Sequence, residues 1–296
     1  MTALEVLDLR ESGREAWLAA RKLGSSDAAA ICGLNKWRTP YQVWAEKTGL
    51  AAPQTENEAM RWGNLLEPVI AAEFGDRTGL IVRKNDKLLV SQSHPFMTDT
   101  PDYWTNEDGV QGVVEIKNTS LYQASDWDGG VPDAAHVQAS HHMAVTGLTF
   151  CYVVGLVGGN KLVWHRIERD EAIIHALIQK LEAFWELVQT KTPPPLVGAD
   201  TDTLNAMYPD SSERHVVLPS SFEHLCSAYK QAKKDEEAMK DRASLIAAQI
   251  KAELADASSA TAGKYKIRWK KQTRAGYYCK PSESRPMFID VVKEAK

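Results

Sequence analysis

The sequence predicts an α/β protein with a mixed central sheet flanked by helices and a helical tail that ends in a basic strand. Three observations predict this class. The apolar residues change from helical spacing to strict alternation and back, in the order helix, β-meander, helix, strands, helix. Three consecutive prolines at residues 193–195 end that series, because proline cannot continue a helix. A long charged segment and a short basic segment follow them.

The N-terminal elements are expected to be helices, since apolar positions recur at helical spacing between capping residues. Residues 25–33 are expected to form a short helix that Ser25 or Ser26 caps and Gly33 ends. Two further helices are expected at residues 40–48 and 57–78, the second ending at Gly79.

The centre of the chain alternates apolar and polar residues, which predicts strands. The predicted strands cover residues 88–90, 95–105, 110–117, 150–157 and 162–166, with a hairpin turn at residues 106–109. Helices are expected at about residues 132–145 and 173–188, and the second of these is strongly amphipathic.

The composition shift at the prolines predicts the domain organisation. A core domain is expected at residues 1–192, a proline-rich linker at 193–217, which is irregular from residue 200, and an extension at 218–296. Within the extension, residues 218–256 predict a long charged helix and residues 264–279 a basic strand or hairpin.

Composition sets limits on function. The 296 residues are 44% hydrophobic and carry a net charge of −4, so a nucleic-acid surface has to come from local clusters of Lys and Arg. The four cysteines are far apart, which disfavours zinc or iron–sulfur sites and favours a reduced intracellular protein. No apolar run reaches the roughly 20 residues of a membrane span, so no membrane partner is expected.

Glu67 is the first candidate for chemistry. It falls on a helical face that is otherwise apolar or small, where an unpaired carboxylate would cost several kcal/mol. The carboxylate therefore needs a cation as a partner. The structural alternative to a functional site is an ion pair with Arg61, Arg77 or Arg83.

Alternation within residues 113–117 places Glu115 and Lys117 on the same face of a strand. Counting back across the predicted turn puts Asp102 within a residue or two of Glu115 on the neighbouring strand. Taken alone, the acid–apolar–lysine triplet is typical of a surface ion pair. With Asp102 and Glu67 it predicts an oxygen-rich site for one or two Mg²⁺ or Mn²⁺ ions, which suits phosphodiester hydrolysis.

At this point the sequence resembles a known family, the lambda-exonuclease-like or YqaJ-type phage recombinases of the PD-(D/E)xK nuclease fold. The resemblance covers about residues 14–190 and includes six ordered motifs. These are Gly24–Gly33, Arg61–Glu67, Thr100-Pro101-Asp102, Glu115-Ile116-Lys117, His136-Val137-Gln138 and Met143–Gly147. Tyr103 is a departure, since relatives commonly have glycine after the Pro-Asp pair.

The resemblance implies roles for individual residues. Glu67, Asp102, Glu115 and the carbonyl of Ile116 would bind metal, and Lys117 would be the catalytic lysine. Gln138 would lie beside the site, although a plain polar helix residue is its structural alternative. Arg21 and Ser26, with Ser25 as a rival, would bind a 5′ phosphate, the alternative being a helix cap beside a surface arginine.

Other residues have weaker assignments. The adjacent His141 and His142 are interpreted as packing or DNA-facing residues rather than metal ligands, because they point about 100° apart on a helix. Trp37 is a candidate for stacking on bases, with core packing as its alternative. The long helix has a broken apolar pattern that suits another subunit or a partner protein.

The basic segment of the extension is a possible DNA contact, with a solvated edge strand as the alternative reading. Its cations alternate with apolar residues, and those singled out are Lys264, Lys266, Arg268 and Lys270.

The resemblance implies a Mg²⁺-dependent 5′-to-3′ exonuclease on linear double-stranded DNA. It would leave 3′ single strands for a single-strand annealing protein, would act in the cytoplasm of a bacterial host of a phage or prophage, and would be a homo-oligomer, by resemblance a trimeric ring. The alternatives are a structure-specific endonuclease or nickase of the same fold and a non-catalytic DNA-binding scaffold. A phosphate pocket near the acidic site would favour the exonuclease.

Overall fold

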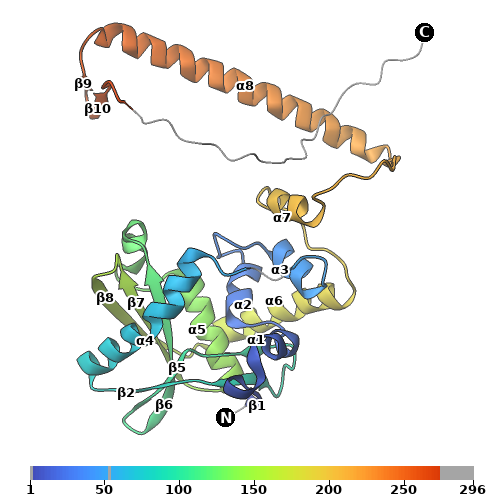
Figure 1. The fold of residues 1–296 in the computed structure, drawn as a ribbon, viewed down its shortest axis with the longest axis vertical. Helices are drawn as coiled ribbons and strands as arrows, with labels where there is room; N and C mark the ends of the chain where they lie inside the picture. Colours follow the sequence, from blue (N-terminus) through green and yellow to red (C-terminus); the bar gives the residue numbers. More distant parts are fainter. Residues whose placement is uncertain (1–2, 53–54, 274–296) are drawn as a thin grey trace. The chain divides into compact units, whose positions relative to one another are not determined.

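The computed structural model describes residues 3–52 and 55–273 (Figure 1). The chain divides into two compact units, Met1–Met207 and Tyr208–Lys296, and each is described by itself. The predicted basic segment extends beyond residue 273, so its last part, with Cys279, lies outside the described residues.

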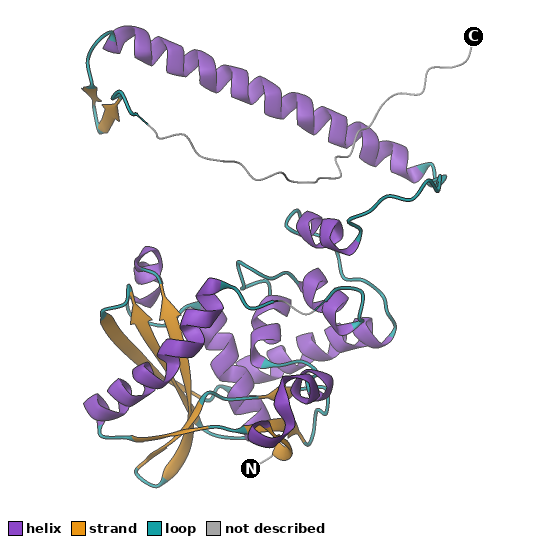
Figure 2. Ribbon diagram, in the orientation of Figure 1, coloured by secondary structure: helices purple, strands orange, loops and turns teal. Residues whose placement is uncertain are grey.

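A five-stranded mixed sheet is the centre of the first unit (Figure 2). Its strands, in spatial order, are β2 (Ile81–Lys84), β5 (Tyr103–Glu107), β6 (Val110–Thr119), β7 (Phe150–Val157) and β8 (Lys161–Glu168). All neighbours are antiparallel except β6 and β7. A parallel pair needs a crossover connection. Here the connection contains the 3₁₀ helix η1 (Leu121–Trp127) and α5 (Asp133–Thr146).

Helices cover both faces of this sheet. Helix α4 (Glu58–Thr78) packs on one face, where Phe74 contributes to a buried cluster with Val114 of β6. Helix α5 packs on the other face, where Met143 shares a cluster with Val113. Because successive strand residues alternate between faces, Glu115 and Lys117 project toward the α5 side.

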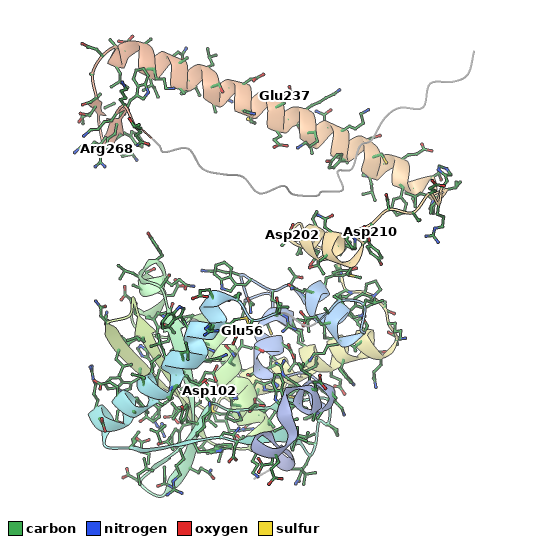
Figure 3. The ribbon with its side chains drawn as sticks, in the orientation of Figure 1. Glu56, Asp102, Asp202, Asp210, Glu237 and Arg268 are labelled. Atoms are coloured by element: carbon green, nitrogen blue, oxygen red, sulfur yellow. The ribbon has the colours of Figure 1, made fainter. Side chains whose placement is uncertain are left out.

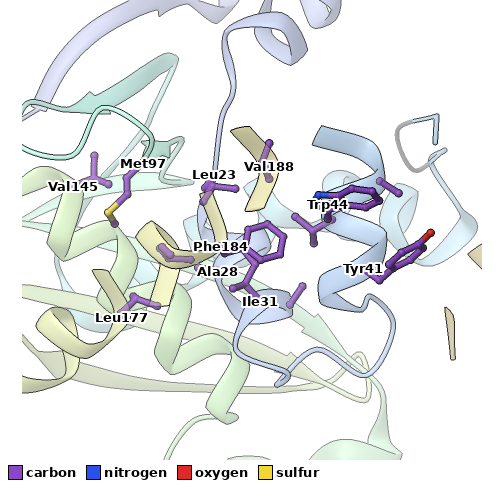
Figure 4. Close-up of a cluster of buried hydrophobic side chains, with 14 of the residues drawn as sticks. Leu23, Ala28, Ile31, Tyr41, Trp44, Met97, Val145, Leu177, Phe184 and Val188 are labelled. Atoms are coloured by element: carbon purple, nitrogen blue, oxygen red, sulfur yellow. The ribbon is translucent and has the colours of Figure 1, made fainter. Parts of the chain in front are cut away.

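A smaller three-stranded sheet is formed by β1 (Ala3–Asp8), β3 (Lys87–Ser91) and β4 (Thr98–Asp99). Helices α1 (Leu9–Ala20), α2 (Ser25–Ile31), α3 (Pro40–Lys47) and α6 (Glu171–Gln189) belong to the same unit. The amphipathic α6 buries Leu177 and Phe184 in a cluster with Leu23 and Trp44 (Figure 4). This core holds the α2–α3 segment in place, and α2 also packs against α5.

The predicted helix ends are largely confirmed. Helix α4 begins after Asn57, whose side chain accepts a hydrogen bond from the Met60 N–H, and it ends at Gly79 with φ of 74°. Helix α5 ends in the same way at Gly147. Glycine adopts the left-handed backbone conformation without steric cost, which explains why both helices end at a glycine.

The cap of α2 was predicted wrongly. The N-cap is Gly24 rather than Ser25 or Ser26, and the carboxylate of Asp27 accepts a hydrogen bond from the Gly24 N–H at 3.0 Å. The serines therefore lie in the first turn of the helix with their hydroxyls released from capping.

Several elements differ from the prediction. The strand expected at residues 95–105 is split between β4 and β5, which belong to different sheets. Residues 200–207, expected to be irregular, form α7 (Asp200–Met207). Its first turn is held in place by the Asp200 side chain, which accepts hydrogen bonds from the Val197 N–H at 2.7 Å and from the Thr39 hydroxyl. The elements β1, α1 and β2 were not predicted at all.

The second unit contains the expected long helix, α8 (Ser221–Leu254), followed by a hairpin of β9 (Ser259–Ala262) and β10 (Tyr265–Arg268). Most of α8 is exposed. Among the described residues, no helix has the length and apolar character needed to cross a membrane.

Candidate active site

Asp102 is the residue immediately before β5, and β5 pairs with β6 in the sheet (Figure 3). Tyr103 is opposite Val114, so Asp102 comes next to Glu115 as predicted. The Asp102 carboxylate accepts a hydrogen bond from the Ile116 N–H at 2.8 Å. This bond fixes the carboxylate against the strand that carries Glu115 and Lys117.

Glu115 is almost fully buried, with 4% of its surface exposed, and both its carboxylate oxygens are engaged. Oε1 accepts a hydrogen bond from Lys117, and Oε2 lies 2.9 Å from Nε2 of His142. Burial alone would raise the pKa of Glu115, but the charges of Lys117 and His142 lower it well below the usual range. Glu115 is therefore a buried carboxylate that stays ionised.

His142 holds Glu115 from the α5 side and is fully buried. Its Nδ1 lies 2.8 Å from Oδ2 of Asp99 in β4. Burial lowers the pKa of His142, but Asp99 and Glu115 raise it to about 10, so the ring is protonated and donates to both carboxylates. The DNA-facing interpretation of His141 and His142 is thus wrong, since both are buried inside the unit.

The pKa of Asp102 is raised well above its ordinary value. Burial is the largest cause, and the neighbouring charge of Glu115 raises it further. Lys117 opposes this effect, and the charge of Glu67 adds to it. Three carboxylates thus create a negative potential at Asp102 that is only partly neutralised, the kind of site in which a cation is stabilised.

Glu67 reaches this region from α4, on the opposite face of the sheet. Its carboxylate forms an ion pair with Lys84 of β2, and the Tyr103 hydroxyl also bonds to it. The partners expected from the sequence, Arg61, Arg77 and Arg83, were the wrong ones.

In these side-chain positions, the three carboxylates do not form the predicted oxygen-rich metal site. Within residues 3–52 and 55–273, no group of three or more His, Cys, Asp or Glu side chains could hold a metal ion as placed. Glu67 turns to Lys84, while Glu115 turns to Lys117 and His142.

A pocket of about 690 Å³ opens beside Lys117 and is also lined by Gln138 and Trp37. Trp37 is 76% exposed, so it is not a core residue. Gln138 comes from α5, one turn before His142. The pocket therefore brings the predicted catalytic lysine, the predicted glutamine and the predicted stacking residue to one place.

A charged cluster surrounds Asp27 next to α2. Buried Asp27 contacts Arg21 at 3.3 Å, Lys47 at 3.1 Å and Arg38, which also pairs with Glu46. Burial opposes ionisation of Asp27, yet the three cations hold its pKa far below the ordinary range. With three cations against two carboxylates, the cluster has a net positive charge.

Arg21 and Ser26, the predicted phosphate-binding pair, meet at this cluster. The guanidinium donates to the Ser26 hydroxyl at 2.8 Å and lies 5.0 Å from the ring of Trp17. Ser25 is the first residue of α2 and is half-buried.

The segment predicted to bind phosphate is joined to the acidic site through β4. The N–H of Leu23 bonds to Phe96, and the N–H of Thr98 bonds to Leu23, beside Asp99. The chain from Arg21 to Gly24 therefore lies next to the strand whose Asp99 holds His142.

The fold and the site define a protein class. Pro101-Asp102 precedes β5, Glu115-Ile116-Lys117 lies in β6, and both come together on a mixed sheet flanked by helices. This arrangement is that of the PD-(D/E)xK fold, as the sequence predicted.

Comparison with known proteins identifies the family. Residues 16–149 match the model of the YqaJ-like viral recombinase domain. The uncharacterised protein YqaJ of Bacillus subtilis (strain 168) is 32% identical over 270 residues, which cover 88% of this chain and 84% of that protein. The chain belongs to the YqaJ family of viral recombinases.

Similar solved structures include an alkaline exonuclease from Laribacter hongkongensis, with 26% identity and a TM-score of 0.49, covering 60% of this chain and 94% of that one. A phage-related exonuclease from Haemophilus somnus 129PT has 14% identity and a TM-score of 0.46, covering 57% and 94% of the two chains.

Proposed function

We propose that this chain is a metal-dependent deoxyribonuclease that digests linear double-stranded DNA from its 5′ ends and leaves 3′ single strands. The observation that carries the proposal is the convergence of Asp102, Glu115 and Lys117 at one end of β5 and β6. Membership in a family of viral recombinases supports DNA as the substrate.

The donor set fits a hard divalent cation. Asp102, Glu115, Glu67 and the carbonyl of Ile116 would hold one or two Mg²⁺ ions, for which Mn²⁺ could substitute, since carboxylate and carbonyl oxygens suit these metals. The raised pKa of Asp102 supports this fit, because a cation would relieve the repulsion from Glu115 and Glu67. Lys84 is half exposed, so it can leave Glu67 for solvent. When bound, the metal would polarise the scissile phosphate.

The protein's own groups then have distinct tasks. Burial lowers the pKa of Lys117, but Glu115 and Asp102 raise it above its ordinary value, so Lys117 is a cation. It would orient the attacking water and offset charge on the phosphate, rather than remove a proton. Gln138 lines the same pocket and would hydrogen bond to the water or the substrate.

The cluster at Arg21 supports an exonuclease rather than an endonuclease. Arg21 and Ser26, with Ser25 nearby, would bind a terminal 5′ phosphate, for which the net positive charge around Asp27 provides a countercharge. A terminal phosphate exists only at a DNA end. A protein that anchors it would therefore cut linear DNA in preference to closed circles.

Three DNA substrates test this proposal when they are incubated with the wild-type chain in Mg²⁺. They are a linear duplex with 5′ phosphates, the same duplex with 5′ hydroxyls, and a closed circle of the same sequence. The expected result is mononucleotide release from linear DNA, faster with phosphate, and no cutting of the circle. Cutting of the circle would indicate an endonuclease instead, and intact DNA in both Mg²⁺ and Mn²⁺ would contradict any nuclease assignment.

The same proposal includes partners. The 3′ strands would pass to a single-strand annealing protein, and the chain would act as a homo-oligomer, in the cytoplasm of a bacterial host. Exposed apolar residues of α8, including Leu225, Met239 and Ile246, support contact with another subunit. Sedimentation of the full chain tests this point, since a monomer at micromolar concentration would contradict it.

A further inference from the structure

The second unit carries a concentrated positive charge near the end of α8. Residues 257–273 contain five Lys or Arg residues and no Asp or Glu. Since the whole chain has a net charge of −4, the remaining residues have a net charge of −9. Such segregation is notable because an acidic protein is repelled by DNA unless a local patch is basic.

The β9–β10 hairpin sorts these residues onto two faces. Lys266 is directly opposite Thr261, and Arg268 is directly opposite Ser259. Because directly opposed residues share a face, this face combines cations with hydroxyl groups. The other face pairs Tyr265 with Ala262 and Ile267 with Ala260.

Trp269, at the end of the apolar face, contacts the helix. Trp269 continues the alternation of Tyr265 and Ile267, and the ammonium of Lys251 in α8 lies 5.4 Å from its ring. The Trp269 N–H also bonds to the Ser258 carbonyl at 2.9 Å. The hairpin is therefore attached to the end of α8, and its basic face is exposed, as Figure 3 shows for the labelled Arg268.

The cations of the basic face are available for a ligand. None of Lys264, Lys266, Arg268 and Lys270 forms an ion pair with another residue in the part of the chain that the structure describes. Alternate residues on a strand are about 6.7 Å apart, which corresponds to roughly two steps of about 3.4 Å along one DNA strand. The spacing of the cations thus corresponds to every second phosphate along one strand.

We infer that the β9–β10 hairpin binds the sugar–phosphate backbone of duplex DNA, independently of base sequence, through Lys266, Arg268 and the hydroxyls of Thr261 and Ser259. Cations and hydroxyls are the groups that contact phosphate oxygens in protein–DNA complexes. The inference rests on the proposed function for its choice of DNA. It adds a substrate contact outside the acidic site, one that needs neither metal nor Lys117.

The test is the salt dependence of DNA binding by the full chain in EDTA, where no cleavage interferes. Anisotropy of a labelled blunt duplex of 30 base pairs is measured from 50 to 200 mM KCl for wild type and for the double variant Lys266→Gln with Arg268→Gln. Each lost phosphate contact reduces the magnitude of the negative slope of log K against log salt by about 0.9. The expected decrease for the double variant is therefore about 1.8.

A matched control removes the same charge elsewhere on the second unit, with Lys240→Gln and Arg242→Gln on the exposed surface of α8. Its slope should equal that of wild type. A hairpin variant with an unchanged slope would overturn the inference and leave the lysines as protection of an edge strand against aggregation. Equal decreases in both variants would also overturn it, since they would indicate a general charge effect.

Failure of the proposed function is distinguishable from failure of this inference. Hairpin-dependent DNA binding without cleavage in Mg²⁺ would support the inferred hairpin contact and contradict the proposed nuclease activity. DNA cleavage by the wild type, together with an unchanged salt slope in the hairpin variant, would support the nuclease activity and contradict the hairpin contact.

Discussion

His142 bridges two carboxylates, with Nδ1 2.8 Å from Oδ2 of Asp99 and Nε2 2.9 Å from Oε2 of Glu115. The bridge ties β4 of the small sheet to β6 of the large one through α5. Because Lys117 occupies the other oxygen of Glu115, the orientation of that carboxylate is fixed from two sides. His142 is thus a positioning residue for the proposed metal ligand.

His142→Gln is expected to lower the rate of nucleotide release by roughly 10- to 100-fold, the usual effect of losing a group that orients a metal ligand. Glutamine can hold one carboxylate but not both, so the Mg²⁺ concentration for half-maximal rate should also rise. His141→Gln is the control, because His141 is equally buried on α5 and no bond joins it to Glu115 within the described residues. An equal effect of both variants would point to a general packing defect.

Arg21→Gln is expected to abolish the preference for a 5′ phosphate. Arginine offers a charge and paired N–H donors to a phosphate, and glutamine offers neither charge nor the fork. The measurement is the ratio of digestion rates for phosphorylated and hydroxyl-ended duplexes, with the exposed neighbour Lys22→Gln as control. A ratio that stays at the wild-type value would place the 5′ end elsewhere.

Asp27→Asn is expected to destabilise the first unit by about 3–5 kcal/mol, because it leaves Arg21, Arg38 and Lys47 without their shared buried partner. The pKa of Asp27 is depressed in the folded state, so its contribution is complete above the ordinary value of 3.8 and decreases progressively as pH falls from that value toward the much lower folded-state pKa. Urea unfolding at pH 7 and at pH 3 should show a smaller difference between variant and wild type at pH 3. A difference that grows on acidification would contradict this account.

Gly155→Ala is expected to destabilise the protein by about 1–3 kcal/mol. Gly155 is opposite Lys117 in the β6–β7 pair, and an added Cβ would overlap the ring of Trp127, which lines the same pocket as Lys117. The comparison is Gly63→Ala in α4, where the Cβ meets open space. That change should stabilise by up to about 1 kcal/mol. Thermal unfolding of both variants tests the contrast.

Local patterns in the sequence were sufficient to predict the geometry at the centre of the candidate site. Alternation placed Glu115 and Lys117 on one face, and the turn at residues 106–109 set the register that brings Asp102 beside them. The structure confirms both geometric predictions. They succeeded because a strand has a period of two and a hairpin turn fixes which residues are opposed.

Non-local partners could not be predicted in the same way. Lys84, the partner of Glu67, lies in the short strand β2, whose residues show no strong alternation. Asp99, the partner of His142, is far away in the sequence and lies in a two-residue strand. A buried histidine beside apolar Met143 and Val145 was a signal for a carboxylate partner, but it did not specify which one.

The most direct test of the central claim compares wild type with Asp102→Asn and Lys117→Ala on 5′-phosphorylated linear duplex in Mg²⁺. Both variants should lose at least about 100-fold in the rate of nucleotide release while keeping a cooperative thermal transition, because each removes a group that the proposed mechanism assigns to the reacting phosphate. Lys161→Ala, at the start of β8, should retain the wild-type rate. Digestion by either site variant within about twofold of wild type would contradict the assignment of this site.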